Sequence, residues 1–219
     1  MQAKPHVRIR EKWLPFGIAL LFLIGFGGIA SKVREEGAWI QSFDERVMTF
    51  ARKLETPLLS TIMKGITHLG DSWPVVGIGI VALIVLALLR YRIELLFFIV
   101  VNGGSAWLNT ILKQLFQRTR PMAGRLVEAV GYSFPSGHSM AAFTLYGVLA
   151  YLLWKHMTLR GSRAILAGAG TLLVLLIGFS RIYVGVHYPS DVAGAYMASG
   201  AWLCVAIGLF RLRQARVGR

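Results

Sequence analysis

Residues 93–116 form a long apolar stretch that decides the fold class. They read IELLFFIVVNGGSAWLNTILKQLF, in which Glu94 and Lys113 are the only charged residues. A helix of about 20 apolar residues crosses the hydrocarbon core of a bilayer. The stretch therefore predicts a membrane-spanning helix with a lysine near its last turn.

Five other stretches of the chain are also long or apolar enough to cross a membrane. We expect these spans at residues 14–30, 73–89, 138–154, 164–182 and 191–210. The first follows a basic N-terminus, as the core of a signal peptide does, but it is longer than a typical signal core. We therefore expect a retained helix there. The pattern predicts an all-α protein, an integral membrane bundle of six transmembrane helices in one domain over residues 1–219.

The composition supports this class. Hydrophobic residues make up 55% of the chain and charged residues 16%, with a mean hydropathy of +0.59, whereas soluble domains carry about a quarter charged residues. The net charge is +14, but the cations cluster between apolar stretches, which is typical of membrane topology signals. We expect no nucleic-acid partner. Cys204 is the single cysteine, so an intrachain disulfide is excluded.

The lysines and arginines also predict an orientation. Thirteen lie in the N-terminus, the C-terminal tail and the connections after residues 89 and 154; eleven lie on the other side, six of them among six acidic residues in 31–72. Cytoplasmic loops are enriched in Lys and Arg, so we expect a multi-pass protein of the cell membrane with both termini cytoplasmic. Apart from those in 31–72, five cations lie on the outer side: Lys113, Arg118, Arg120, Arg125 and Arg181. Charged residues at membrane depth are functional candidates, so we treat these five as candidates.

Residues 31–72 are too long for a simple connection. Val47, Phe50 and Leu54 recur at helical spacing, and Pro57 can begin a second helix. We expect short amphipathic helices lying on the outer face.

Three short segments carry residues suited to chemistry on a phosphoryl group. They are KQLFQRTRP at 113–121, PSGH at 135–138 and SRIYVGVHYPSD at 180–191. All three fall at outer-face ends of the expected spans. Three of their cations are Lys113, Arg120 and Arg181, and the two arginines can bind phosphate oxygens in a bidentate manner. Ser136 and the Gly137 amide lie where a helix begins, which is a favourable place for an anion.

The same segments hold two histidines and a carboxylate. One imidazole can attack phosphorus while the other protonates the departing oxygen, which divides the displacement into two steps. Asp191 follows His187 by four residues, so it can orient that ring and stabilise its charged form.

In order and spacing, the segments match the KxxxxxxRP, PSGH and SRxxxxxHxxxD motifs of the type 2 phosphatidic acid phosphatase superfamily. The chain resembles its bacterial membrane lipid phosphatases, among them phosphatidylglycerophosphatases and undecaprenyl diphosphatases. The resemblance implies a phosphohistidine on His187, with Asp191 as its orienting partner and His138 as the general acid. It implies no metal and no cofactor. The phosphoryl oxygens would be bound by Lys113, Arg120, Ser136, the Gly137 amide and Arg181.

The resemblance implies a lipid phosphate or diphosphate substrate at the outer leaflet. Undecaprenyl diphosphate, phosphatidylglycerol phosphate, phosphatidic acid and diacylglycerol pyrophosphate all fit, and the motifs do not choose among them; they also leave the oligomeric state open. Two other functions are weighed. A haloperoxidase holding vanadate is disfavoured by the membrane spans. A lipid transporter or scrambler that only binds headgroups would not need a histidine pair with a carboxylate partner.

Several polar residues have a simpler interpretation. We expect Arg118 and Arg125 to be loop cations that contact headgroups, and we assign no role to His6 or His156. His68 and Asp71 could fold over the site, although substrate contact is the less favoured interpretation. On the 93–116 span, interhelical hydrogen bonding is favoured over substrate contact for Asn102, Ser105 and Asn109.

Overall fold

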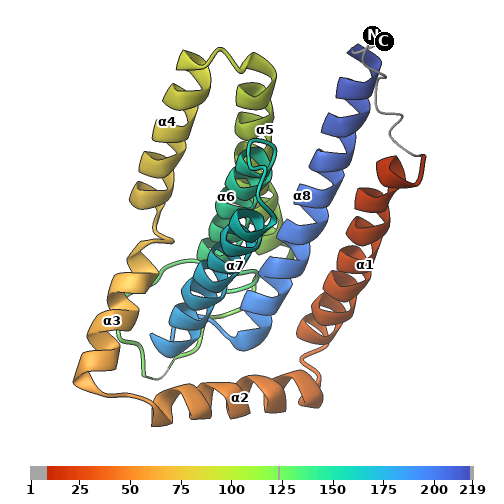
Figure 1. The fold of residues 1–219 in the computed structure, drawn as a ribbon. Helices are drawn as coiled ribbons and strands as arrows, with labels where there is room; N and C mark the ends of the chain where they lie inside the picture. The colour runs from red at the N-terminus through yellow and green to blue at the C-terminus, as the bar shows by residue number, and fades with distance from the viewer. Residues whose placement is uncertain (1–8, 123, 218–219) are drawn as a thin grey trace.

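The computed structural model describes residues 9–122 and 124–217, so the predictions for Lys4, His6, Arg8 and Arg219 lie outside it. The described residues fold into helices with no strand among them, which confirms the all-α class (Figure 1). In chain order the helices are α1 (Ile9–Arg34), α2 (Ala38–Lys53), α3 (Pro57–His68), α4 (Ser72–Leu88), α5 (Arg92–Phe116), α6 (Gly137–Trp154), α7 (Arg160–Tyr183) and α8 (Pro189–Val217).

The long helices run side by side, and α2 lies across one end of them (Figure 1). Helix α1 packs along α8, where small residues let the two approach closely. A Cβ at Gly200 would come within 2.7 Å of the Phe22 ring, and one at Gly208 within 2.6 Å of the Phe16 ring. The first apolar stretch is therefore an integral part of the packed bundle.

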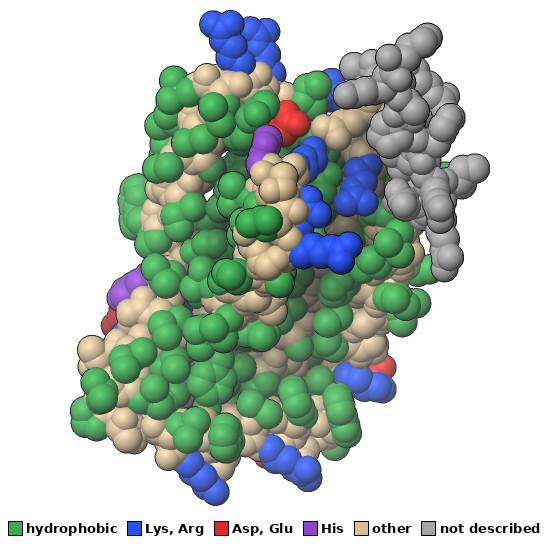
Figure 2. Space-filling model, in the orientation of Figure 1, with side chains coloured by type: hydrophobic (Ala, Val, Ile, Leu, Met, Phe, Trp, Pro, Cys, Tyr) green, Lys and Arg blue, Asp and Glu red, His purple; other side chains and the backbone are tan. Residues whose placement is uncertain are grey.

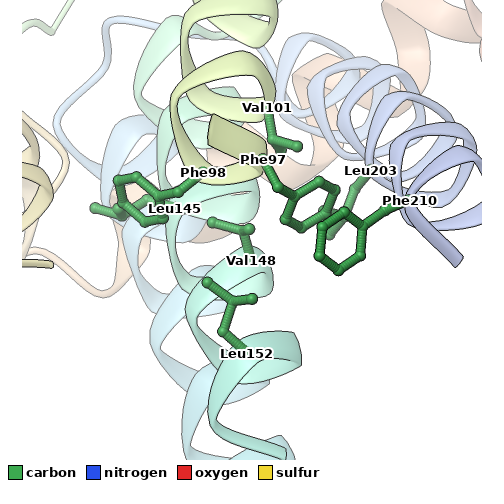
Figure 3. Packing of buried hydrophobic residues seen from close by; sticks show 8 residues of the cluster. All are labelled: Phe97, Phe98, Val101, Leu145, Val148, Leu152, Leu203 and Phe210. Carbon is green, nitrogen blue, oxygen red and sulfur yellow. The ribbon is translucent and has the colours of Figure 1, made fainter. Parts of the chain in front are cut away.

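A hydrophobic cluster joins α5, α6 and α8 at the ends remote from the motif segments (Figure 3). The rings of Phe97 and Phe210 stack with their centroids 4.3 Å apart, and Val148 of α6 is fully buried. This packing fixes the three helices that carry the motif segments at their other ends.

The outer surface of the long helices is strongly apolar. Exposed fractions reach 69% for Leu21, 78% for Leu88 and 73% for Ile165. On the face in Figure 2, hydrophobic side chains cover most of the surface. Such a surface is stable in lipid and would be unusual in water. The chain is a membrane protein.

The described helices that can cross a membrane are fewer than the six expected spans. By length and apolarity, four described helices can cross a membrane: α1, α5, α7 and α8. A fifth span results if α3 and α4, which meet at a 46° bend, count as one. Helix α6 has 18 residues and begins with the polar sequence Gly137-His138-Ser139. The prediction of six spans is not confirmed.

Residues 31–72 contain the two expected short helices. Thr56 caps α3 by accepting a hydrogen bond from the Leu59 amide at 3.2 Å, and Pro57 takes the first position, where its missing N–H costs nothing. Helix α2 buries Asp44 against the bundle and leaves Trp39 and Phe50 exposed. The helical prediction is confirmed, and the placement on the outer face stays a prediction.

Candidate active site

The three motif segments meet at the end of the bundle that α2 crosses. Backbone hydrogen bonds tie the loop between α5 and α6 to the α7–α8 connection and to the first turn of α8: Leu126 N donates to Val184 O at 2.9 Å, and Ser136 N donates to Asp191 O at 3.1 Å. Gly185 takes a positive φ of +74° here, and a Cβ on it would clash with the Gly124 carbonyl at 2.6 Å. The loop therefore packs directly over the predicted histidine.

His187 and Asp191 lie together because α8 begins between them. His187 Nδ1 is 3.3 Å from Asp191 Oδ2. The same oxygen accepts hydrogen bonds from Ser133 Oγ at 2.5 Å and Tyr188 N at 2.8 Å. His187 is 1% exposed and Asp191 0%. The predicted pair is formed and held in one geometry.

Arg120 identifies which nitrogen of His187 carries the lone pair. Its Nη1 lies 3.0 Å from His187 Nε2 and also donates to the Val186 carbonyl at 2.9 Å. Burial lowers the pKa of His187 to about 3 despite the opposing effect of Asp191, so the ring is neutral. A guanidinium only donates, hence Nε2 accepts, and Nδ1 holds the proton facing Asp191.

Arg118 corrects one prediction. It does not extend to headgroups: its Nη1 donates to Asp191 Oδ1 at 2.7 Å, and its Nη2 to Asp44 Oδ2 at 2.8 Å. Its guanidinium also lies 4.1 Å above the Tyr188 ring. Burial opposes its charge, yet the carboxylates of Asp191 and Asp44 raise the pKa of Arg118. Arg118 thus binds the catalytic candidate Asp191 through Oδ1, the carboxylate oxygen that is not at His187.

Arg125 is exposed and donates from Nε to the Pro121 carbonyl at 2.5 Å. Its headgroup contact stays a prediction.

The two other predicted cations also point into this region. Lys113 Nζ donates to the Tyr132 carbonyl. Arg181 is 4% exposed and donates from Nη1 to Thr67 Oγ1 at 2.6 Å. Its Nε is the one buried side-chain nitrogen or oxygen, among the residues that the structure describes, without a hydrogen-bond partner. Buried polar groups are normally paired, so this donor is a candidate contact for a phosphoryl oxygen.

The PSGH segment forms the start of α6. Ser136 is its N-cap: Ser136 Oγ accepts hydrogen bonds from Ser139 N at 3.4 Å and Ser139 Oγ at 2.9 Å. A Cβ at Gly137 would meet Asn109 Oδ1 at 3.2 Å, so α5 and α6 approach closely here. The Gly137 amide belongs to the first turn of α6, whose positive end favours an anion.

His138 has a carboxylate partner that sequence analysis did not identify. Its Nε2 is 2.5 Å from Asp71 Oδ1, and His68 Nδ1 is 2.5 Å from Asp71 Oδ2. Asp71 lies in the bend between α3 and α4, and a Cβ on the neighbouring Gly70 would come within 3.3 Å of the His138 ring. The segment before α4 therefore folds onto the site, bringing a carboxylate 67 residues away to His138.

The polar residues of α5 bond mostly within the protein. Ser105 and Thr144 share a hydrogen bond of 2.9 Å between α5 and α6, and Asn109 Nδ2 donates to Met140 Sδ of α6 at 3.1 Å as well as to the Pro135 carbonyl at 3.3 Å. Interhelical bonding is confirmed for these two. It is wrong for Asn102, which donates to the Phe98 carbonyl of its own helix at 2.9 Å. All three line, with His138, a cavity of about 340 Å³ between α4, α5 and α6.

Residues that could hold a metal ion do not cluster in the part of the chain that the structure describes. Residues 9–122 and 124–217 contain no group of three or more His, Cys, Asp or Glu side chains placed to hold a metal ion. The metal-free, cofactor-free chemistry implied by the motifs stays an expectation.

A family model described as the PAP2 superfamily matches residues 94–215. The chain belongs to the PAP2 superfamily. The match spans α5 to α8 and contains all three motif segments, so the resemblance seen in the sequence is confirmed.

Named relatives agree with this membership. The chain is 35% identical over 184 residues to phosphatidylglycerophosphatase B of Bacillus subtilis, covering 83% of this chain and 87% of that protein. It is 35% identical over 76 residues to an undecaprenyl-diphosphatase of Sulfolobus acidocaldarius, covering 33% of this chain and 30% of that one. The crystal structure of a PAP2-type phosphatidylglycerolphosphate phosphatase from B. subtilis matches with a TM-score of 0.78 at 32% identity, covering 90% and 96%. From its family and these relatives, this chain is a membrane phosphatase.

Proposed function

We propose that this PAP2 protein removes phosphate from lipid phosphates or diphosphates through a phosphohistidine on His187, at the extracytoplasmic leaflet. One observation carries the mechanism: the hydrogen-bonded order Asp191, His187, Arg120. This order supports a neutral imidazole with its lone pair on Nε2, directly beside a guanidinium that can bind the phosphoryl group under attack.

In the first step, Nε2 of His187 forms a bond to phosphorus as the bond to the lipid oxygen breaks. His138 gives its proton to that oxygen. Asp191 stabilises the charge that develops on His187, as a carboxylate does for the histidine of a catalytic triad. Preorganised donors around the phosphoryl oxygens offset their charge in the transition state, and we assign this work to Lys113, Arg120, Ser136, the Gly137 amide and Arg181.

In the second step, water attacks phosphorus and breaks the N–P bond. His138, now neutral, accepts the proton from that water, so inorganic phosphate leaves and both histidines return to their starting states. With the lipid substrate and one water molecule as reactants, both steps balance.

The names of the relatives support the substrate class. A phosphatidylglycerophosphatase and an undecaprenyl-diphosphatase act on different lipids but both release phosphate. We therefore propose undecaprenyl diphosphate, phosphatidylglycerol phosphate and phosphatidic acid as substrates, with the choice set by the lipid-binding surface.

Phosphate release from purified protein in detergent tests this proposal. Wild-type protein should release phosphate from these lipids in the presence of EDTA. His187→Ala should release none, while His156→Ala should match the wild type because His156 is exposed, beyond the far end of α6. Activity lost in EDTA and restored by Mg²⁺ would contradict the metal-free mechanism, and an active His187→Ala would remove the nucleophile.

A further inference from the structure

We propose that Asp71 is a positioning residue for His138: its carboxylate binds Nε2 of the ring, keeps the ring protonated and directs Nδ1–H toward the leaving oxygen. This inference rests on the proposed function, in which His138 is the general acid. It adds to the PAP2 site a carboxylate from the bend between α3 and α4, outside the three motif segments and outside the residues of the family match.

The geometry is that of a shared carboxylate. Asp71 Oδ1 lies 2.5 Å from His138 Nε2 and Oδ2 lies 2.5 Å from His68 Nδ1. The backbone at Asp71 is also anchored: its N–H donates to the His68 carbonyl at 3.0 Å, and its own carbonyl accepts from the Val75 amide at 3.1 Å. With both oxygens and both backbone groups bonded, Asp71 has little freedom to leave the His138 ring.

The charges around His138 explain why it needs such a partner. Burial is the largest effect that disfavours the charged form of the His138 ring, and Arg181 from the end of α7 and Arg120 from the loop after α5 oppose its protonation further. A general acid must carry its proton before the reaction begins. An adjacent carboxylate favours the charged form of an imidazole, and Asp71 is the group that supplies it. The orientation also follows, because a ring bound through Nε2 has only Nδ1 left for the substrate.

His68 completes the arrangement from the exposed side. Its side chain is 67% exposed, whereas those of Asp71 and His138 are 35% and 25% exposed. By bonding to Oδ2, His68 holds the plane of the carboxylate so that Oδ1 faces His138. The site thus contains two carboxylate–imidazole pairs: Asp191 with the nucleophile, and Asp71 with the acid.

Two substrates with the same lipid chains separate this role from a merely structural one. Phosphatidic acid must expel an alkoxide, which needs a proton, whereas diacylglycerol pyrophosphate expels a lipid monophosphate, which needs it less. General acid catalysis contributes roughly 10²–10⁴-fold. Asp71→Asn removes only part of that contribution, so it should lower kcat on phosphatidic acid by roughly 10-fold or more, and lower it much less on the pyrophosphate, with little change in KM. The alkaline limb of its kcat profile should move to lower pH.

Matched variants complete the test. Asp71→Glu should recover part of the lost rate, His68→Gln should show a weaker loss of the same kind, and the exposed Glu55→Gln should match the wild type. In a His138→Ala background, Asp71→Asn should cause no further loss, because two residues that act through one interaction are not additive.

Equal losses on both lipids, or additive losses in the His138→Ala background, would overturn the role of Asp71. If Asp71→Asn does not fold, the same two measurements are made on His68→Gln: the comparison of the two lipids and the additivity with His138→Ala. Phosphoenzyme trapping on wild-type protein separates failure of the Asp71 inference from failure of the proposed function. If a phosphohistidine is trapped but the Asp71 variants lose equal activity on both lipids, only the inference about Asp71 is refuted.

Discussion

Replacing Arg118 by methionine should destabilise the protein and impair catalysis together. Arg118 bonds to Asp191 and Asp44, which are 0% and 2% exposed. Methionine fills a similar volume but leaves two buried carboxylates facing each other without a cation. Removing one partner of a buried ion pair costs about 3–5 kcal/mol. At roughly 2–4 °C per kcal/mol for a protein of this size, the melting temperature should fall by about 6–20 °C.

Thermal unfolding in detergent, followed by tryptophan fluorescence, measures this shift. Arg125→Met is the matched control, since Arg125 is an exposed arginine on the same loop and should leave the melting temperature nearly unchanged. Adding Asp44→Asn to Arg118→Met removes one of the unpaired charges and should restore part of the stability. The kcat of Arg118→Met should fall because Asp191 loses the cation that holds it toward His187. Equal melting temperatures for the two methionine variants would refute this account of Arg118.

Three further predictions test the acid, the orientation and the charge state of the nucleophile. His138→Ala should lose more activity on a lipid monophosphate than on a lipid diphosphate, because the diphosphate has the better leaving group; equal losses in a phosphate-release assay would argue against its role as acid. In a chain whose Cys204 has been replaced, cysteines introduced at Arg125 and Tyr188 should react with a membrane-impermeant reagent on intact cells. Labelling only after lysis would show that the predicted orientation in the membrane is wrong. The pKa of His187 is about 3 in the folded protein against 6.5 for an unperturbed histidine, so below pH 6.5 the unfolded chain takes up the proton first and stability falls as the pH drops toward 3. The melting temperature should therefore decline more steeply from pH 6.5 to 4 in the wild type than in His187→Gln, and parallel curves would contradict a buried neutral ring.

The parts of the site that the sequence predicts are those set by local spacing. His187 and Asp191 are four residues apart at the start of a helix, so an i,i+4 contact follows once α8 is recognised. Pro57 likewise marks the start of α3 by its own chemistry. Apolar runs longer than about 20 residues indicate membrane helices because the bilayer thickness sets their length.

The parts that escape prediction depend on long-range packing. Arg118 meets Asp44 across 74 residues, and His138 meets Asp71 across 67. Nothing in the local pattern shows that α2 closes over the motif segments, so Asp44 reads as an ordinary surface residue. For Asp71 the sequence indicates that its segment could fold over the site, but it does not show the pairing with His138. The expected span at 138–154 is not confirmed for a related reason: α6 begins with polar residues of the site itself, which shortens its apolar part.

Trapping the covalent intermediate tests the central claim most directly. Wild-type protein is mixed with a ³²P-labelled lipid phosphate, quenched in alkaline detergent to preserve phosphohistidine, and digested for peptide mapping. The account predicts label on the peptide that contains His187, retained in alkali, lost in acid and absent from His187→Ala. Label on His138 in its place, or continued turnover with no labelled histidine at all, would contradict it.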